Sequence, residues 1–102
     1  MTRIAINGFG RIGRPTLRRI LDNHPNLEVV AINDITDRTT LEHLFKYDSV
    51  YGIYEKTISK NTEIFAEKDP VKLPWKKLGV EVVLECSGEF SKIEGARKHL
   101  EA

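Results

Sequence analysis

The chain has 102 residues, which is enough for one domain with a modest hydrophobic core. It carries 16 Lys and Arg residues against 15 Asp and Glu residues, and its apolar runs are far too short to cross a bilayer, so neither nucleic acid nor a membrane is a predicted partner. The one cysteine, Cys86, excludes an internal disulfide and a multi-cysteine metal site, and it fits a reducing cytoplasm.

The N-terminal third of the chain predicts a strand, a helix and a second strand. Residues 3–7 (RIAIN) form the first apolar strand, into which the chain opens directly, without a signal peptide. Residues 11–23 follow as a helix, since Leu17 and Ile20 recur at helical spacing. Residues 27–33 (LEVVAIN) form the second apolar strand.

The middle of the chain predicts shorter elements. Thr39 and Glu42 have the spacing of a capping box, which begins a helix over about 39–47. Residues 53–58 and 62–66 are predicted to be two short strands connected by a turn.

The C-terminal third predicts one more strong strand between two helical segments. Residues 73–75 open a single helical turn that Gly79 closes, and residues 80–85 (VEVVLE) form the strand. Ser91 and Glu94 have capping-box spacing, and the helix after them runs to the last residue without a stop signal. We therefore expect residues 1–102 to be only the N-terminal part of a domain.

Strands that alternate with helices predict the α/β class, with a Rossmann-type, doubly wound parallel sheet that is incomplete. The right-handed crossover rule places the three strong strands in the spatial order second–first–third. The third strand then has an open edge, which favours self-association.

Three glycines lie between the first strand and the first helix. Gly8, Gly10 and Gly13 form the pattern G-x-G-x-x-G, which in a βαβ unit indicates a dinucleotide site. The first glycine allows a tight turn, the second lets the backbone approach a pyrophosphate, and the third lets the helix pack against the sheet. The unpaired N–H groups at the helix start then face the phosphates.

An acidic residue at the end of the second strand completes this fingerprint. Asp34 directly follows LEVVAIN and lies 21 residues after Gly13. A carboxylate at this place accepts hydrogen bonds from the adenosine ribose. The glycines and Asp34 together therefore predict a dinucleotide site rather than an ordinary glycine turn.

Five segments together resemble one enzyme family. They are INGFGRIGR at 6–14, AIND at 31–34, LFKYDSVYG at 44–52, AEKDP with LPW within 66–75, and GVEVVLECSGEF at 79–90. Their combination resembles glyceraldehyde-3-phosphate dehydrogenase along the whole chain. The resemblance implies the NAD-binding part of a cytoplasmic homotetramer of glycolysis or gluconeogenesis, which oxidises an aldehyde phosphate with NAD and inorganic phosphate to an acyl phosphate.

The resemblance also implies which residues bind NAD. The backbone of Arg11 and Ile12 meets the pyrophosphate, Asn33 lies near the adenosine, and Asp34 lies on its ribose. Lys68 lies beside the adenine. The other implied cofactor-binding residues are Asn7, Gly8, Phe9, Gly10 and Gly13 in the first turn, and Ser87, Gly88 and Phe90 on the nicotinamide side.

The chain departs from the family pattern in three places. Lys68 stands where the family usually has arginine, so the charge is kept but planar stacking on adenine is lost. Tyr51 stands where the family usually has histidine. Only 13 residues, 53–65, separate Gly52 from Ala66, which is about a hairpin fewer than is common in the family.

The catalytic segment of the family is absent from the chain. Neither the S-C-T-T-N segment with its cysteine nor the later histidine is present, so no catalytic residue is assigned and the chain alone is predicted to be inactive. Cys86 is not expected to take over, because a reactive cysteine needs a neighbouring cation or base and free cysteines are usually buried. No His lies at metal-ligand spacing from Glu or Cys, so no metal is predicted.

The remaining charged and aromatic residues are assigned to packing and solvation. Arg18 and Arg19 are predicted to lie on the solvent-exposed face of the first helix. The aromatic residues in the middle of the chain are predicted to pack in the core or an interface rather than stack on RNA; they are Phe45, Tyr47, Tyr51 and Tyr54.

Two other interpretations of the whole chain stay open at this point. Erythrose-4-phosphate dehydrogenase has a similar N-terminal half, and a substrate domain would distinguish it. A non-catalytic nucleotide-binding or assembly module would bind NAD and form a defined oligomer without turnover.

Overall fold

The structure is a computed structural model that describes residues 2–48, 52–54, 56–69 and 72–86. The predicted helix after Ser91 lies outside the described residues. So do three of the predicted site residues and one aromatic residue, which are Ser87, Gly88, Phe90 and Tyr51.

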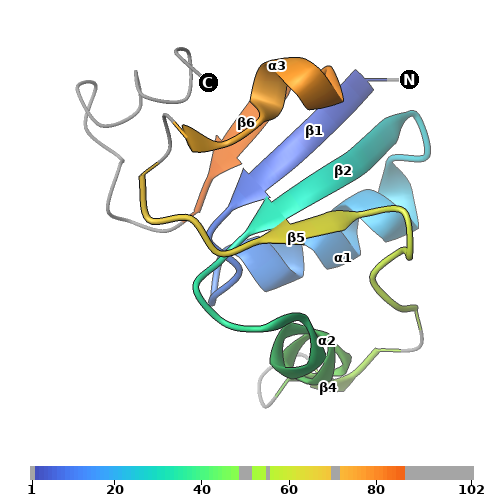
Figure 1. Cartoon of the computed structure of the whole chain (residues 1–102). Helices are drawn as coiled ribbons and strands as arrows, with labels where there is room; N and C mark the ends of the chain where they lie inside the picture. The colour runs from blue at the N-terminus through green and yellow to red at the C-terminus, as the bar shows by residue number, and fades with distance from the viewer. Residues whose placement is uncertain (1, 49–51, 55, 70–71, 87–102) are drawn as a thin grey trace.

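Four parallel strands form the central sheet (Figure 1). They are β1 (Thr2–Asn7), β2 (Leu27–Asn33), β5 (Glu63–Phe65) and β6 (Val82–Glu85), in the spatial order β5-β2-β1-β6. This confirms the α/β class and the predicted order of the three strong strands, with the first strand inside the sheet. The fourth strand, β5, is added at the outer edge of β2.

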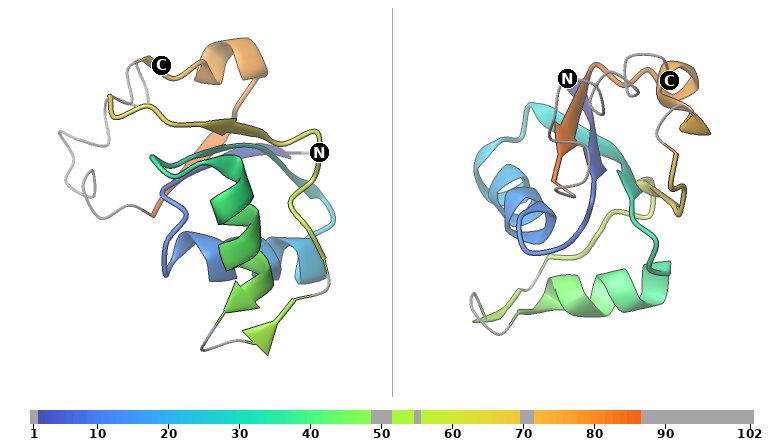
Figure 2. Two further views of the ribbon diagram at one scale, coloured as in Figure 1. Left: turned by 60° about the horizontal axis from the view of Figure 1, so that its bottom comes forward. Right: turned by 90° about the vertical axis from the view of Figure 1, so that its left-hand side faces the viewer.

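Helices cover both faces of this sheet (Figures 1 and 2). The helices α1 (Gly13–Asn23) and α2 (Arg38–Lys46) lie on one face, and the single turn of α3 (Trp75–Leu78) lies on the other. Gly79 ends α3 with a left-handed φ of 69°, as the sequence predicted. The described part of the chain thus has the layers of a doubly wound fold.

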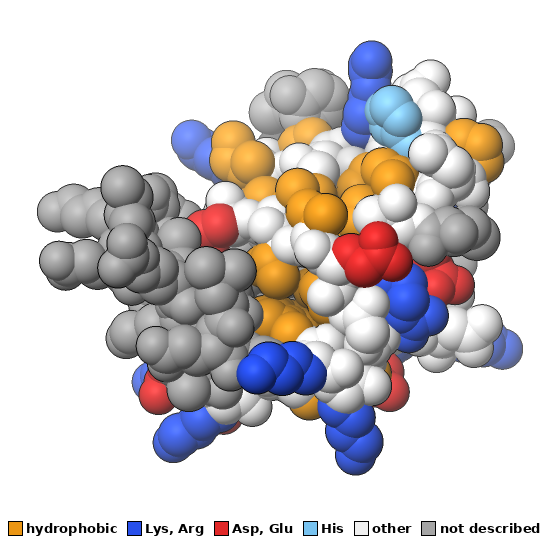
Figure 3. All heavy atoms as spheres, turned by 90° about the horizontal axis from the view of Figure 1, so that it is seen from above, with side chains coloured by type: hydrophobic (Ala, Val, Ile, Leu, Met, Phe, Trp, Pro, Cys, Tyr) orange, Lys and Arg blue, Asp and Glu red, His pale blue; other side chains and the backbone are white. Residues whose placement is uncertain are grey.

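Each face of the sheet has its own hydrophobic core. The core under α1 and α2 consists of Ile6, Phe9, Leu17, Ile32, Leu41, Phe45 and Ile58. The core under α3 consists of Ala5, Val30, Ala31, Leu73 and Trp75. Seen from above, the side on which α3 lies, hydrophobic side chains gather near the centre of the surface, beside residues that are not described (Figure 3).

The N-terminus of α2 is capped by a residue that the sequence pattern did not indicate. Asp37, not Thr39, is the N-cap, and its Oδ1 accepts a hydrogen bond from Thr40 N at 2.8 Å. Glu42 does not close a capping box, because its carboxylate binds Arg38 instead, at 2.7 Å. An aspartate that precedes the first turn caps more effectively than a threonine inside it.

Removal of the Asp37 cap is expected to destabilise the protein in a pH-dependent way. The backbone hydrogen bond from Thr40, followed by the one from its hydroxyl, lowers the pKa of Asp37 below the usual value of an aspartate. The cap therefore stabilises the fold fully above about pH 4, and this contribution disappears as the pH falls through the lowered pKa. We expect Asp37→Ala to lower the thermal midpoint at pH 7, and the difference from the unmodified chain to shrink in acid. Asp37→Asn, which keeps an acceptor, is the control and should lose less; an equal loss in both would contradict the assignment.

The predicted strands at 53–58 and 62–66 are only partly correct. The first is limited to β4 (Gly52–Ile53), which pairs antiparallel with β3 (Tyr47–Asp48). The second is β5, which pairs parallel with β2 in the main sheet. Between them, residues 56–62 form no strand in the described structure.

Side chains, not a partner strand, hold the segment between β4 and β5. The Tyr54 hydroxyl donates to Asp22 Oδ1 at 2.8 Å, and Lys56 Nζ lies 2.9 Å from the same oxygen. Burial, followed by the hydrogen bond to Asp22, raises the pKa of Tyr54 to about 12, so the hydroxyl stays a donor at neutral pH. Ile58 is buried in the core under α1 and α2. These contacts draw the segment towards the helices, which explains why it does not form the predicted strand.

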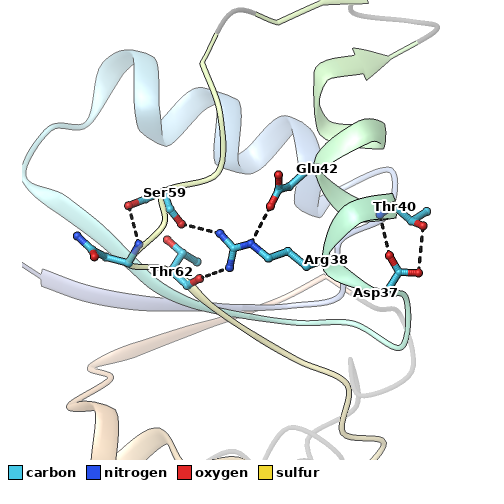
Figure 4. Close-up of polar contacts among 7 residues, drawn as sticks. Asp37, Arg38, Thr40, Glu42, Ser59 and Thr62 are labelled. Carbon is cyan, nitrogen blue, oxygen red and sulfur yellow. Dashed lines mark hydrogen bonds and ion pairs between the residues drawn. The ribbon is translucent and has the colours of Figure 1, made fainter.

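Arg38 fixes the end of this segment, just before β5 (Figure 4). Its Nη1 donates to the Thr62 carbonyl at 2.8 Å and its Nη2 donates to the Ser59 carbonyl at 2.9 Å, while Nε binds Glu42. The Thr62 hydroxyl in turn donates to the Val29 carbonyl of β2 at 2.7 Å. The planar guanidinium therefore sets the entry of the chain into β5.

The prediction that Arg18 lies on the solvent-exposed face of α1 is wrong. Arg18 is half-buried, and its Nη2 donates to the carbonyls of Phe45 at 2.7 Å and Gly52 at 3.0 Å. Its guanidinium also lies over the Tyr54 ring, 4.7 Å from the centroid. Arg19 is exposed, as predicted. Arg18 thus joins α1 to the end of α2 and to β4. The Phe45 carbonyl lies in the last turn of α2, where carbonyls need a donor from outside the helix.

Candidate functional site

The glycine turn connects β1 to α1 at the carboxyl end of the sheet. Gly8 has a φ of 94°, a left-handed conformation that favours glycine. A Cβ added at Gly13 would lie 2.1 Å from the Gly8 carbonyl oxygen, so the first turn of α1 sits directly on the turn that precedes it. The helix begins at Gly13, two residues later than predicted. Both glycines are therefore required by the protein itself.

Gly10 differs from the other two glycines. An added Cβ at this position meets nothing within 4 Å, and its φ lies outside the left-handed region. Arg11 next to it is exposed, and Ile12 is 63% exposed although it is a large hydrophobic residue. Ile12 is also the N-cap of α1 and provides no side-chain hydrogen bond, and the first turn has no acidic residue. Within the part of the chain that the structure describes, the start of α1 is thus exposed and suited to an anion.

Asp34 lies against the glycine turn. Its Oδ2 accepts a hydrogen bond from Phe9 N at 2.8 Å, and its Oδ1 accepts one from Thr36 N at 3.0 Å. A backbone hydrogen bond also holds the end of β2 against the turn, since Gly8 N donates to the Asn33 carbonyl at 2.8 Å. Asp34 is only half-buried. The structure therefore brings the predicted acidic residue to the predicted turn and leaves part of its carboxylate accessible.

Asn7 and Asn33 are turned into the protein. They are 3% and 5% exposed, and Asn33 Nδ2 donates to Asn7 Oδ1 at 2.7 Å. Asn7 Nδ2 donates to Glu85 Oε2 at 2.8 Å. The Asn33 amide pairs with the backbone of Glu67, with Oδ1 accepting from its N–H at 2.9 Å and Nδ2 donating to its carbonyl at 2.8 Å. The side chains of these two predicted site residues are therefore buried next to the glycine turn, where they connect the ends of the strands.

The remaining predicted residues are distributed around the turn. The Phe9 side chain is buried, with its ring centroid 5.6 Å from that of Phe45, so only its backbone belongs to the site. Lys68 is exposed and follows Glu67, which the Asn33 amide holds beside β2. Ile35, directly after Asp34, is 71% exposed. An exposed apolar side chain thus directly follows Asp34, and an exposed cation directly follows Glu67.

Cys86 lies at the end of β6 and is half-buried. Burial, followed by the negative charge of Glu85, raises the pKa of its thiol, and the hydrogen bond with Thr16 acts in the opposite direction. A raised pKa disfavours the thiolate form of Cys86, which is the form that acts as a nucleophile. Among the residues that the structure describes, no His, Cys, Asp and Glu side chains form a group suited to a metal, and no helix is long and apolar enough to span a bilayer.

Sequence reasoning missed two residues that shape the site. Glu85 and Glu67 were not among the candidates, although Glu85 is the last residue of β6 and Glu67 lies two residues after β5. Both strands end at the same edge of the sheet as Asn7. The signal in the sequence was a polar residue at the last position of each strand or within two residues after it. Only the register between strands shows that these residues meet.

The chain is similar to known proteins of one family along most of its length. The family model described as "Glyceraldehyde 3-phosphate dehydrogenase, NAD binding domain" matches residues 2–93. The chain is 55% identical to glyceraldehyde-3-phosphate dehydrogenase of Clostridium pasteurianum over 112 aligned positions, which cover 100% of the chain and 33% of that protein. It is 52% identical to the enzyme of Thermotoga maritima, with 100% and 34% covered, and 48% identical to that of Geobacillus stearothermophilus, with 98% and 32% covered. The chain thus spans about a third of the length of the curated relatives it matches.

Proposed function

The chain belongs to the family of glyceraldehyde 3-phosphate dehydrogenase NAD-binding domains, and we propose that it binds NAD at the carboxyl ends of β1 and β2, as the cofactor-binding part of a phosphorylating glyceraldehyde-3-phosphate dehydrogenase. The relatives compared above carry this name, which supports it over an erythrose-4-phosphate dehydrogenase. NAD, when bound, supplies the hydride acceptor for oxidation of an aldehyde. The complete protein, in this proposal, is a cytoplasmic homotetramer of glycolysis or gluconeogenesis.

Gly10 is the observation that carries the proposal. Nothing in the described protein requires glycine there, since a side chain at this position would project into open space. A glycine that the fold does not need fits a position where a ligand approaches the backbone closely. The residues present therefore fit a dinucleotide, whose pyrophosphate would lie over Gly10 and the start of α1.

Each part of the site has a role in this proposal. The backbone at Arg11 and Ile12 holds the pyrophosphate, and the accessible part of the Asp34 carboxylate accepts from the adenosine ribose. Lys68 lies beside the adenine as a point charge. Ser87, Gly88 and Phe90, which lie outside the described residues, are assigned to the nicotinamide side by the resemblance to the family alone. The residues of the chain bind and orient the cofactor, and the thiol and base of the reaction belong to the rest of the enzyme.

The site is expected to prefer NAD over NADP by at least about tenfold, a difference of about 1.4 kcal/mol. A 2′-phosphate would face the Asp34 carboxylate, and two like charges about 4 Å apart repel by about 4 kcal/mol at the effective dielectric of a protein surface. Arg38, the first arginine after Asp34, cannot offset this, because its guanidinium is bound to Glu42 and to the carbonyls of Ser59 and Thr62.

Calorimetric titration of the chain with both cofactors tests this preference. Asp34→Ala should weaken NAD binding, since it also removes the bond to Phe9 N, and should bring the ratio of the two affinities towards one. Asp37→Ala is the matched control, because it also removes one carboxylate close to Asp34 in the sequence. The Asp37 carboxylate is exposed and accepts a hydrogen bond from Thr40 N instead of contacting the glycine turn. Equal binding of NAD and NADP by the unmodified chain, or an unchanged ratio in Asp34→Ala, would show that Asp34 does not select the cofactor.

A further inference from the structure

A row of hydrogen-bonded polar groups crosses the whole sheet at the carboxyl ends of its strands. It starts at the Glu85 carboxylate on β6, continues through the amides of Asn7 on β1 and Asn33 on β2, and ends at the backbone of Glu67 after β5. All of the contacts between these groups measure 2.7–2.9 Å. We call these four residues the polar row. It lies directly under the glycine turn, since Gly8 N donates to the Asn33 carbonyl.

Donors and acceptors in the polar row can be ordered in only one way. An ionised carboxylate only accepts, so Glu85 requires the nitrogen of the Asn7 amide to face it. The Asn7 oxygen then faces β2, where it requires the nitrogen of Asn33. The Asn33 oxygen remains for the N–H of Glu67. The Glu85 carboxylate at one end of the polar row and the Glu67 backbone at the other end therefore require the same order of donors and acceptors. The buried amides of Asn7 and Asn33 lose stability if a donor meets a donor.

The last member of the polar row belongs to the loop that carries Lys68. Beyond Phe65 the ladder between β5 and β2 continues with one backbone bond, from Asp34 N to the Phe65 carbonyl. The Asn33 amide then replaces a strand partner, because it makes both a donor and an acceptor contact with Glu67. Asp69 N donates to Glu67 Oε1 at 3.1 Å, which ties the rest of this loop to the same residue.

We propose that Glu85 is a positioning residue that fixes the loop Glu67–Asp69 through Asn7 and Asn33. Glu85 on β6 thereby determines the position of the loop that carries Lys68, although β1 and β2 lie between β6 and that loop. The effect on adenosine binding rests on the proposed function, in which Lys68 lies beside the adenine. The orientation of the Glu67 loop by Glu85 does not depend on it.

Glu85→Gln tests the proposal with little change in shape. A glutamine amide can present either its oxygen or its nitrogen to Asn7, whereas the Glu85 carboxylate can only accept. The substitution therefore removes the charge that holds the nitrogen of the Asn7 amide towards β6. We expect the backbone amide resonance of Glu67 and the side-chain amide resonances of Asn33 to move in a ¹H–¹⁵N NMR spectrum. We also expect AMP, the probe for the adenosine end, to bind about tenfold more weakly, as for one poorly satisfied buried hydrogen bond. Glu81→Gln is the matched control, because Glu81 is exposed just before β6, and it should change neither readout.

The outcomes separate the proposal from the proposed function. Changes confined to the Asn7 amide in Glu85→Gln, with Glu67 and AMP binding as in the control, would overturn the proposal. Failure of the unmodified chain to bind NAD and AMP would contradict the proposed function, while the Glu67 resonance would still decide the role of Glu85. If Glu85→Gln does not fold, Asn7→Ser cuts the same row and must move the Glu67 resonance; an unchanged resonance there also overturns the proposal.

Discussion

Replacement of Gly13 by alanine is expected to destabilise the protein by about 3 kcal/mol, the upper end of the usual cost of overpacking. The new Cβ would lie 2.1 Å from the Gly8 carbonyl oxygen and 3.1 Å from its carbonyl carbon. These are backbone atoms of a turn that Asp34 and Asn33 hold from the other side, so the contact cannot be relieved by a rotamer change. Urea denaturation followed by far-UV circular dichroism measures the loss as a lower midpoint.

Gly10→Ala is the control for this variant and is expected to show the opposite result. Its Cβ projects into open space, so the urea midpoint should stay within about 0.5 kcal/mol of the unmodified chain. NAD binding should fall by at least about tenfold, because the methyl group would lie where the proposed function places the pyrophosphate. Equal stability of the two variants would contradict the packing of α1 on the turn, and unchanged NAD affinity in Gly10→Ala would contradict the placement of the pyrophosphate.

Arg18→Met is expected to cost about 1.5–3 kcal/mol of folding stability, the range for hydrogen bonds to a charged group. The variant keeps most of the aliphatic stem but leaves the carbonyls of Phe45 and Gly52 without the guanidinium donor. It also removes the cation that lies over the Tyr54 ring. Because these contacts join α1 to α2 and β4, the loss should appear as a lower midpoint for the whole domain.

Arg19→Met provides the comparison for Arg18, since Arg19 is the next residue on the same helix and is exposed. It should change stability by less than about 0.5 kcal/mol. Arg18→Lys should restore only part of the loss, because an ammonium does not reproduce the planar fork. A loss in Arg18→Met no greater than that in Arg19→Met would show that Arg18 is not a structural link.

The features that were predictable from the sequence are those encoded locally. The strand RIAIN, the glycines that follow it and LEVVAIN each carry their own pattern, and the spacing of Asp34 from Gly13 follows from the βαβ unit. The order of the three strong strands was predictable as well, because the crossover rule admits few alternatives.

The features that were not predictable depend on contacts between distant parts of the chain. Arg18 and Arg19 have the same chemistry in the sequence, and only the position of α2 decides which of them binds its terminal carbonyls. Asp37 outcompetes Thr39 as a cap because the chain enters α2 in an extended conformation at Asp37. The polar row depends on the register between strands up to 78 residues apart, for which a single sequence gives no local signal.

The position of β1 between β2 and β6 has a consequence for synthesis on the ribosome. β1 is made first, yet the edge that it presents to β6 has no partner until Val82–Glu85 are made. At about 5–20 residues per second, the 75 residues from Asn7 to Val82 take about 4–15 s to appear. During that time a nascent β1–α1–β2 unit is paired on one side only, and its apolar strand is available to chaperones or to neighbouring nascent chains.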